Sequence, residues 1–307
     1  MLQQTQVQTV LPYYQRFIQH FPNIKKLAQA PVEEVLRLWA GLGYYSRARH
    51  LHASAQSLWQ RYGGTFPRER KDWQLLKGVG QSTAAAIVAF AFNKQEAILD
   101  GNVKRILARV FLLPSTVPLK DYWLMAESLL PRAEEMPAYT QGLMDLGALI
   151  CKRQNPLCSL CPLTTDCQAH QQNLVSHYPV PKKAPILKEI HLFWPLIFKG
   201  KTLYLVPRPE TGIWAGLLSP PTFDSEQDLK SWLKEKRLPL GTKLTVVKHR
   251  LTHRQLFIHR YEIRCEHLWQ QEKEKGKFYP LQDLINERIP KPLNTTLFFY
   301  TQEGKLF

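Results

Sequence analysis

The sequence lacks long hydrophobic runs. No apolar stretch approaches the roughly 18 residues that a membrane-spanning helix needs, so we expect no association with a membrane. The first residues, Met1-Leu-Gln-Gln-Thr-Gln, are not a basic segment followed by an apolar one, and no signal peptide is expected. Cysteine is scarce, with 5 in 307 residues. That number excludes a disulfide-stabilised scaffold and predicts a cytoplasmic protein.

Acidic residues are also few. The chain has 25 Asp and Glu against 41 Lys and Arg, which gives a formal net charge of +16. An excess of this size predicts a polyanionic partner. Hydrophobic residues make up 44% of the chain, including 8 Trp and 14 Phe, and this content excludes a disordered protein. The length allows one large domain or two ordinary ones.

The first half of the chain has helical periodicity. Apolar residues recur every three or four positions over residues 3–21, and Pro12 is expected to kink or restart this helix. No Ser, Thr, Asp or Asn precedes it as a cap, which predicts that the sequence begins inside its first helix. Further helices are expected over 32–39, 48–62, 82–92, 102–111 and 121–133.

The pattern changes after Cys167. Three prolines in residues 177–185 indicate an extended linker. Strands are expected over 190–197, 203–206, 244–247 and 255–263, with a hairpin turn at Lys199-Gly200-Lys201 and a helix over 225–238. We therefore predict an all-α domain over 1–172, a linker over 173–188 and an α+β domain over 189–307.

Four of the cysteines lie close together. Their spacing is C-x6-C-x2-C-x5-C, formed by Cys151, Cys158, Cys161 and Cys167. Four thiolates on one short loop can bind a 4Fe–4S cluster or a tetrahedral zinc ion. Zinc ribbons more often use two separate C-x2-C pairs, so this spacing favours the cluster and leaves zinc as the alternative. Cys265 lies in strand-like sequence, where we expect a small buried hydrophobic residue.

A glycine hairpin precedes a candidate carboxylate. Gly78-Val79-Gly80 lies between a helical segment around Trp73 and the helix expected from Ser82. Such a turn leaves backbone N–H groups uncovered at a helix N-terminus, where a DNA phosphate can bind, although a plain helix–helix turn fits the same residues. Further along, Asp100 is the second residue of the segment Leu99-Asp-Gly-Asn-Val-Lys-Arg105. It is either an ordinary helix cap or a carboxylate that stabilises a cationic sugar.

Together these motifs resemble the endonuclease III superfamily of DNA glycosylases. Three further segments are similar to the MutY adenine DNA glycosylases, and the resemblance extends over nearly the whole chain: Met1-Leu-Gln-Gln-Thr-Gln-Val7, Gly41-Leu-Gly-Tyr-Tyr-Ser-Arg47 and Met144-Asp-Leu-Gly-Ala148. The resemblance implies an all-α helix-hairpin-helix glycosylase domain with an iron–sulfur cluster loop, followed by an α+β Nudix-like domain. It also implies a repair enzyme that flips adenine out of double-stranded DNA and removes it opposite 8-oxoguanine or guanine. We further expect a monomer in the bacterial cytoplasm, associated with the nucleoid through DNA.

The resemblance assigns roles to residues of the first domain. Asp100 matches the catalytic aspartate, which stabilises the oxocarbenium-like sugar and the intermediate that follows. Asn102 matches the polar residue that helps to position it. Gly78, Val79 and Gly80 match the hairpin that binds backbone phosphate.

Other matched residues concern the lesion and the type of chemistry. Tyr44 matches the aromatic wedge inserted beside 8-oxoguanine; its alternative is a core aromatic, which suits Tyr45 better. Gln4 lies where the family contacts the lesion pair. Ser82 adjoins the DNA-binding hairpin at the position where bifunctional relatives have a lysine that forms a Schiff base. A hydroxyl cannot form that imine, so the resemblance implies a monofunctional glycosylase.

The second domain resembles the family's Nudix-like lesion reader, with Arg208-Pro-Glu-Thr-Gly-Ile-Trp214-Ala-Gly216 following its pattern. The glutamate cluster of a Nudix box is missing, so no metal-dependent pyrophosphatase is expected. Leu251-Thr252-His253 stands where the family often has Phe-Ser-His. Thr252 keeps the hydroxyl for the oxidised base, whereas loss of the Phe alters the packing. His253 is either a DNA contact or an ordinary strand histidine.

One departure concerns the general acid. The family has its catalytic glutamate just upstream, in Glu-Val-Met-Leu-Gln-Gln, and this sequence begins at that Met. General acid catalysis contributes about 10² to 10⁴-fold, so the chain as printed is expected to be impaired or inactive in excision. Three hypotheses stay open: part of a working adenine glycosylase, a non-catalytic lesion-binding protein, or a zinc-bearing DNA-binding regulator.

Overall fold

The computed structural model describes residues 1–180, 187–265, 276–284 and 287–302. The chain divides into two compact units, one formed by Met1–Gln56 with Pro185–Phe307 and the other by Ser57–Ala184. The expected linker lies partly outside the described residues, at 181–186. No helix of the described residues is long and apolar enough to cross a membrane.

The helices of the first unit begin the chain. They are α1 (Val7–His20), α2 (Ile24–Gln29), α3 (Val32–Leu38) and α4 (Ser46–Tyr62), the last of which continues into the second unit. Phe17 of α1 contacts the rings of Phe21 and Trp39 edge to face, with centroids 5.0 and 6.1 Å away. These aromatic contacts hold α1 against the end of α3.

Helix α1 differs from its prediction at the N-terminal end. It begins at Val7 rather than at residue 3, because Gln4 has a φ of +58°, which a right-handed helix cannot contain. The carbonyls of Met1 and Gln3 accept hydrogen bonds from Arg47, a residue distant in sequence. Pro12 lies inside α1, which continues through it, so the predicted restart is wrong.

The rest of the first unit is built on a mixed sheet. Among the described residues the strand order is β3-β2-β1-β6-β4, with β5 paired to β6 and β7 to β2. The strands are β1 (Lys188–Lys199), β2 (Thr202–Pro207), β3 (Leu218–Ser219), β4 (Thr242–Lys243), β5 (Val247–Arg250), β6 (Arg254–Arg264) and β7 (Lys277–Pro280). The central pair β1–β6 is parallel, in register from Lys188↔Arg254 to Phe198↔Arg264, and the other pairs are antiparallel.

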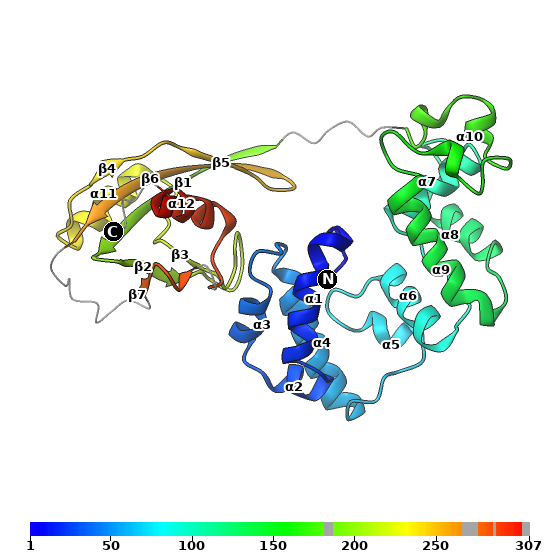
Figure 1. Cartoon of the computed structure of the whole chain (residues 1–307), viewed down its shortest axis with the longest axis horizontal. Helices are drawn as coiled ribbons and strands as arrows, with labels where there is room; N and C mark the ends of the chain where they lie inside the picture. Colours follow the sequence, from blue (N-terminus) through cyan, green and yellow to red (C-terminus); the bar gives the residue numbers. More distant parts are fainter. Residues whose placement is uncertain (181–186, 266–275, 285–286, 303–307) are drawn as a thin grey trace. The chain divides into compact units, whose positions relative to one another are not determined.

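Two helices cover this sheet (Figure 1). Helix α12 (Lys291–Gln302) packs Leu293 and Leu297 into a cluster with Trp194 of β1, whereas α11 (Glu226–Glu235) packs Leu229 into a second cluster with Ile197. Trp194 and Ile197 are three positions apart on β1 and therefore point to opposite faces. The α+β expectation for this segment is thereby confirmed.

Two local predictions in this segment had different outcomes. The hairpin at Lys199-Gly200-Lys201 is present, with Phe198 paired to Leu203 and Gly200 at φ +51°. The strand expected over 244–247 is wrong, because residues 244–246 separate β4 from β5. There the buried Arg260 guanidinium donates to the Thr245 carbonyl at 2.7 Å. This hydrogen bond takes the place of the one that the carbonyl would accept from a neighbouring strand.

The second unit is helical. After the end of α4 it contains α5 (Arg70–Gln74), α6 (Gln81–Phe92), α7 (Gly101–Val110), α8 (Leu119–Ser128), α9 (Met136–Asp145), a π-helical turn η2 (Leu146–Ile150), a 3-10 turn η3 (Cys158–Leu160) and α10 (Gln168–Gln171). Its core joins α6, α7 and α8 through Ala85, Val103 and Tyr122. Helix α9 was not expected, since Pro137 and Gly142 indicate breaks; Pro137 is tolerated in the first turn of the helix.

Candidate active site

The hairpin of the second unit joins α5 to α6. Trp73 is buried, its Nε1–H donates to the Pro67 carbonyl at 2.8 Å, and its ring stacks on Phe66. Gly78 has a φ of +78°, and Gly80 is the N-cap of α6, where it supplies no side-chain cap. The first amides of α6 are therefore uncovered by a cap, as a phosphate-binding helix N-terminus requires.

Ser82 connects this hairpin to the candidate carboxylate. Its Oγ accepts a hydrogen bond from the backbone N–H of Leu99 at 3.0 Å. Leu99 directly precedes Asp100, so the first turn of α6 and the start of α7 are held side by side. The structure therefore brings Ser82 close to the start of the Asp100 helix, through the neighbouring residue Leu99.

Asp100 is the N-cap of α7. Its Oδ1 accepts from the backbone N–H groups of Asn102 at 2.8 Å and Val103 at 2.9 Å. The residue is exposed, and Oδ2 has no hydrogen bond within the described part of the chain. The cap and the functional carboxylate are thus compatible, because one oxygen fixes the group at a helix N-terminus and the other faces solvent.

Asn102 packs closely against Gly147 and accepts a hydrogen bond from Arg105. A Cβ added to Gly147, in the π-helical turn η2, would lie 2.5 Å from the Asn102 Cβ, so only glycine fits there. Arg105 donates from Nη2 to Asn102 Oδ1 at 3.0 Å and to the Gly147 carbonyl at 2.6 Å. Its Nε donates to the Cys151 carbonyl at 2.7 Å. Asn102 is thereby joined to the start of the cysteine loop.

The four clustered cysteines line one pocket. It is small, with a volume of about 30 Å³, and Arg109 and His170 also contribute to its wall. Burial raises the pKa of the Cys158 thiol, and Cys151 and Cys161 raise it further. In the described residues no three His, Cys, Asp or Glu side chains form a group that could hold a single metal ion. The thiols therefore share a pocket without forming a tight cage.

Arg109 of α7 organises this loop. It is 2% exposed, and its guanidinium donates to the carbonyls of Tyr178 and Lys152 at 2.8 Å each and of Arg153 at 3.3 Å. Its Nη1 also lies 3.3 Å from Cys151 Sγ. A single buried cation thus holds two segments that meet at the cysteine pocket.

Two predicted lesion contacts lie in the first unit. Tyr44 is 50% exposed and has a φ of +50°, whereas Tyr45 is half-buried and burial raises its pKa. The Tyr45 hydroxyl accepts from the Gly41 N–H at 3.1 Å, which keeps the loop compact. Gln4 is also exposed. The assignment of the exposed role to Tyr44 and the packing role to Tyr45 agrees with this geometry.

The two remaining predicted residues lie at the turn between β5 and β6. Thr252 and His253 are exposed, and the His253 carbonyl accepts from Lys188 N–H at 3.3 Å. Cys265 follows β6 and is half-buried beside the α11 cluster rather than fully buried, because it lies just beyond the end of the strand.

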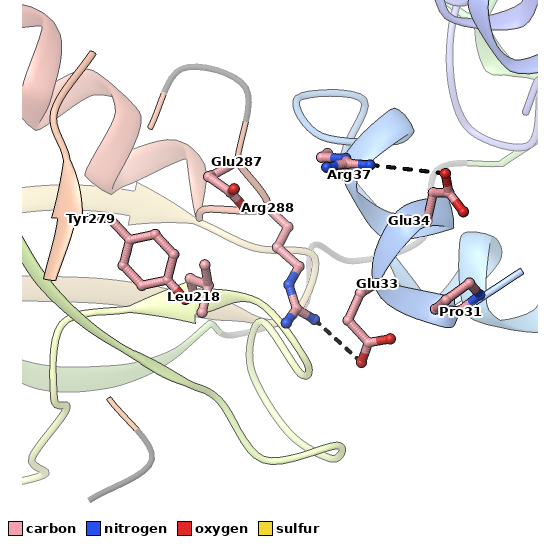
Figure 2. A pocket seen from close by; sticks show the side chains of 8 residues that line it. All are labelled: Pro31, Glu33, Glu34, Arg37, Leu218, Tyr279, Glu287 and Arg288. Carbon is pink, nitrogen blue, oxygen red and sulfur yellow. Dashed lines mark ion pairs between the residues drawn. The ribbon is translucent and has the colours of Figure 1, made fainter. Parts of the chain in front are cut away.

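A separate pocket lies in the first unit between α3 and the sheet. It has a volume of about 350 Å³ and is lined by Pro31, Glu33, Glu34, Arg37, Leu218, Tyr279, Glu287 and Arg288. Figure 2 shows Arg288 directed at Glu33, with 3.9 Å between Nη1 and Oε1. Arg288 also donates to the Gly216 carbonyl at 2.8 Å. None of the residues singled out from the sequence lines this pocket.

Sequence reasoning missed three arginines that hold local structure, Arg47 in the first unit and Arg105 and Arg109 in the second. Each lies in a helix where a basic residue normally indicates a solvated face. The basic pair Lys104-Arg105 after Asp100 gives a local signal for Arg105, although nothing in it shows which cation points inward.

Comparison with known proteins agrees with this architecture. Residues 1–127 match the family model described as HhH-GPD superfamily base excision DNA repair protein, and residues 193–297 match the NUDIX domain. A solved structure of a thermostable thymine-DNA glycosylase superposes with a TM-score of 0.51 at 30% identity, over 56% of this chain and 80% of that one. The helix-hairpin-helix glycosylase fold and the Nudix-like domain are confirmed, and the class is that of DNA N-glycosylases.

Relatives of similar length define the family further. An adenine DNA glycosylase of Buchnera aphidicola subsp. Acyrthosiphon pisum (strain APS) is 36% identical over 97% of this chain and 87% of its own length. A second, from Buchnera aphidicola subsp. Baizongia pistaciae (strain Bp), is 38% identical over 84% of this chain and 75% of its own. The chain therefore belongs to the family of adenine DNA glycosylases.

Proposed function

We propose that this protein acts in base-excision repair by recognising adenine paired with 8-oxoguanine or guanine in double-stranded DNA and hydrolysing its glycosidic bond. The observation that carries this proposal is the placement of Asp100. One carboxylate oxygen is fixed by two helix amides, and the other faces solvent beside the first turn after the glycine hairpin.

This placement suits stabilisation of a cationic sugar. The transition state of glycosidic bond cleavage is oxocarbenium-like, and an anion held rigidly in advance stabilises it without reorganising. Asn102 positions the carboxylate because its backbone N–H donates to Asp100 Oδ1. Its side chain is in turn held by Arg105. Ser82 offers no amine for a Schiff base, so the proposed enzyme is monofunctional.

The proposed DNA contacts fall into two groups. Gly78, Val79 and Gly80 present backbone N–H groups to phosphate, which positions the duplex without reading sequence. On the lesion side, the exposed Tyr44 is inserted as a wedge and Gln4 contacts the pair. The exposed turn at Thr252 and His253 reads the oxidised base.

The spacing of the four cysteines favours a 4Fe–4S cluster at this pocket. Cys151, Cys158, Cys161 and Cys167 would hold it, and the cluster would link four points of the loop into one rigid unit. Support comes from the C-x6-C-x2-C-x5-C spacing and from the four thiols lining one pocket. Arg109 holds the backbone of this loop from inside. Iron and acid-labile sulfide analysis tests this assignment, and stoichiometric zinc instead would overturn it.

The proposal also includes the domain division and the setting. We assign the glycosylase domain to residues 1–172, the linker to 173–188 and the lesion-recognition domain to 189–307. The protein is proposed to act as a monomer in the bacterial cytoplasm, at the nucleoid.

The test measures binding and excision separately on duplexes that contain A·8-oxoguanine, A·G or A·T. Adenine release that is lost in Asp100→Asn, with mispair binding retained, supports the proposed enzyme. Because excision is expected to be impaired without the upstream glutamate, release is measured both for the chain as printed and for a chain extended by Glu-Val before Met1. Tight mispair binding without release by either chain supports the alternative, a non-catalytic lesion-binding protein, and contradicts the glycosylase. Equal affinity for all three duplexes contradicts both. Trapping of the protein on DNA by borohydride would contradict the monofunctional mechanism.

A further inference from the structure

Gln4 and Tyr44, the two predicted lesion contacts near the start of the chain, share an unusual backbone conformation. Gln4 has a φ of +58° and Tyr44 a φ of +50°, both in the left-handed region that non-glycine residues rarely adopt. Such residues persist only where surrounding contacts hold them. The contacts that hold this pair therefore matter for how the two side chains are presented.

One side chain makes these contacts. Arg47, in the first turn of α4, donates from Nη1 to the carbonyls of Met1 and Gln3 and from Nη2 to the Gly43 carbonyl at 3.2 Å. The carbonyls of Gln3 and Gly43 belong to the peptides that directly precede Gln4 and Tyr44. The orientation of those two peptide planes sets φ at the two strained residues, so Arg47 fixes both.

Ring contacts complete the arrangement. The Arg47 guanidinium lies over the rings of Trp39 and Tyr44, 5.4 Å from each centroid. Trp39 Nε1–H donates to the same Gly43 carbonyl at 3.1 Å. Nε of Arg47 is buried and, among the described residues, has no hydrogen-bond partner. Only a planar fork can span carbonyls of two segments while it lies on an aromatic ring, and lysine cannot replace it.

We propose that Arg47 is a positioning residue for lesion recognition, which holds the peptides before Gln4 and Tyr44 so that both side chains are presented to the mispair together. The inference rests on the proposed function, because it takes the lesion roles of Gln4 and Tyr44 from there. Arg47 itself need not contact DNA, since its donors are directed at the protein's own carbonyls.

The experiment is a double-mutant cycle on DNA binding. The affinities for A·8-oxoguanine and A·T duplexes are measured for the wild-type chain, Arg47→Lys, Tyr44→Ala and the double variant. We expect Arg47→Lys to reduce the preference for the A·8-oxoguanine duplex about tenfold, equivalent to about 1.4 kcal/mol. The two losses should not add: in the Tyr44→Ala background Arg47→Lys should cost less affinity than it does alone, because part of its effect passes through Tyr44 and the rest through Gln4.

A spectroscopic readout separates positioning from general destabilisation. 2-Aminopurine placed beside the lesion becomes fluorescent when the stack is opened, and Arg47→Lys should lower this signal at saturating protein. Arg37→Lys is the matched control: Arg37 is in α3, its side chain is 54% exposed, and its substitution should change neither quantity. If Arg47→Lys lacks the native far-UV spectrum, Arg47→Gln, which keeps a donor for one carbonyl, takes its place.

The outcomes are distinguishable. A wild-type chain that does not prefer the A·8-oxoguanine duplex contradicts the proposed function. A wild-type preference that survives Arg47→Lys, or losses that add in the double variant, contradicts the positioning role alone.

Discussion

Removal of the buried Arg109 guanidinium should destabilise the cysteine loop strongly. In Arg109→Ala the carbonyls of Tyr178 and Lys152 lose donors at 2.8 Å, and the weaker bond to Arg153 is lost as well. A hydrogen bond to a charged group contributes about 1.5–3 kcal/mol. Two short bonds therefore give a loss of about 3–5 kcal/mol in the free energy of unfolding, since the site is too buried for water to replace the donors fully.

The assay is thermal unfolding followed by circular dichroism, on proteins matched in iron content. A loss of that size should lower the midpoint of the transition by roughly 10 °C or more. Arg132→Ala is the control, because the Arg132 side chain is 78% exposed and its ion pairs are at the surface, where such pairs contribute about 0–1 kcal/mol. A neutral hydrogen bond contributes about 1 kcal/mol. An Arg109→Ala protein whose free energy of unfolding lies within about that amount of the wild-type value would refute the reasoning.

Three further outcomes are expected. Gly147→Ala should lower the free energy of unfolding by about 1–3 kcal/mol in denaturant titration, because the added Cβ would clash with Asn102. Gly142→Ala in the neighbouring α9 is the control and should be neutral or stabilising, since nothing lies within 4 Å of its Cβ. Burial, with His191 and Lys243, lowers the pKa of His259, so the unfolded chain binds more protons and stability should fall as the pH drops below about 6.5. His259→Phe should flatten that decline in melting curves between pH 7.5 and 5, and an unchanged slope would contradict it. Raising salt from 50 to 200 mM should weaken DNA binding about tenfold or more, because the counterions released by only two neutralised phosphates already give a change of that size. An affinity that does not change with salt would count against phosphate contacts.

Short motifs with fixed spacing were predicted well. The segment that begins at Asp100 and the hairpin before Ser82 are local, so their residue types already restrict the backbone. The cap and the functional carboxylate, posed as alternatives for Asp100, both fit the structure because Oδ1 alone makes the cap hydrogen bonds and leaves Oδ2 without one in the described residues. The four cysteines were grouped by spacing alone, and they line one pocket.

Features that depend on distant contacts could not be predicted. Arg109 is turned inward by carbonyls more than forty positions away along the chain, which no local pattern encodes. The start of α1 is shifted to Val7 by the Arg47 contacts, and the residues between β4 and β5 are withdrawn from the ladder by Arg260. In each case a single side chain overrides the periodicity of the segment that it binds.

The central claim is that this chain recognises adenine opposite 8-oxoguanine through the lesion contacts and the carboxylate described above. The most direct measurement compares its dissociation constants for otherwise identical duplexes that contain A·8-oxoguanine or A·T, at one salt concentration. The account predicts tighter binding to the A·8-oxoguanine duplex, retained in Asp100→Asn and reduced in Tyr44→Ala. Equal dissociation constants for the two duplexes would contradict it.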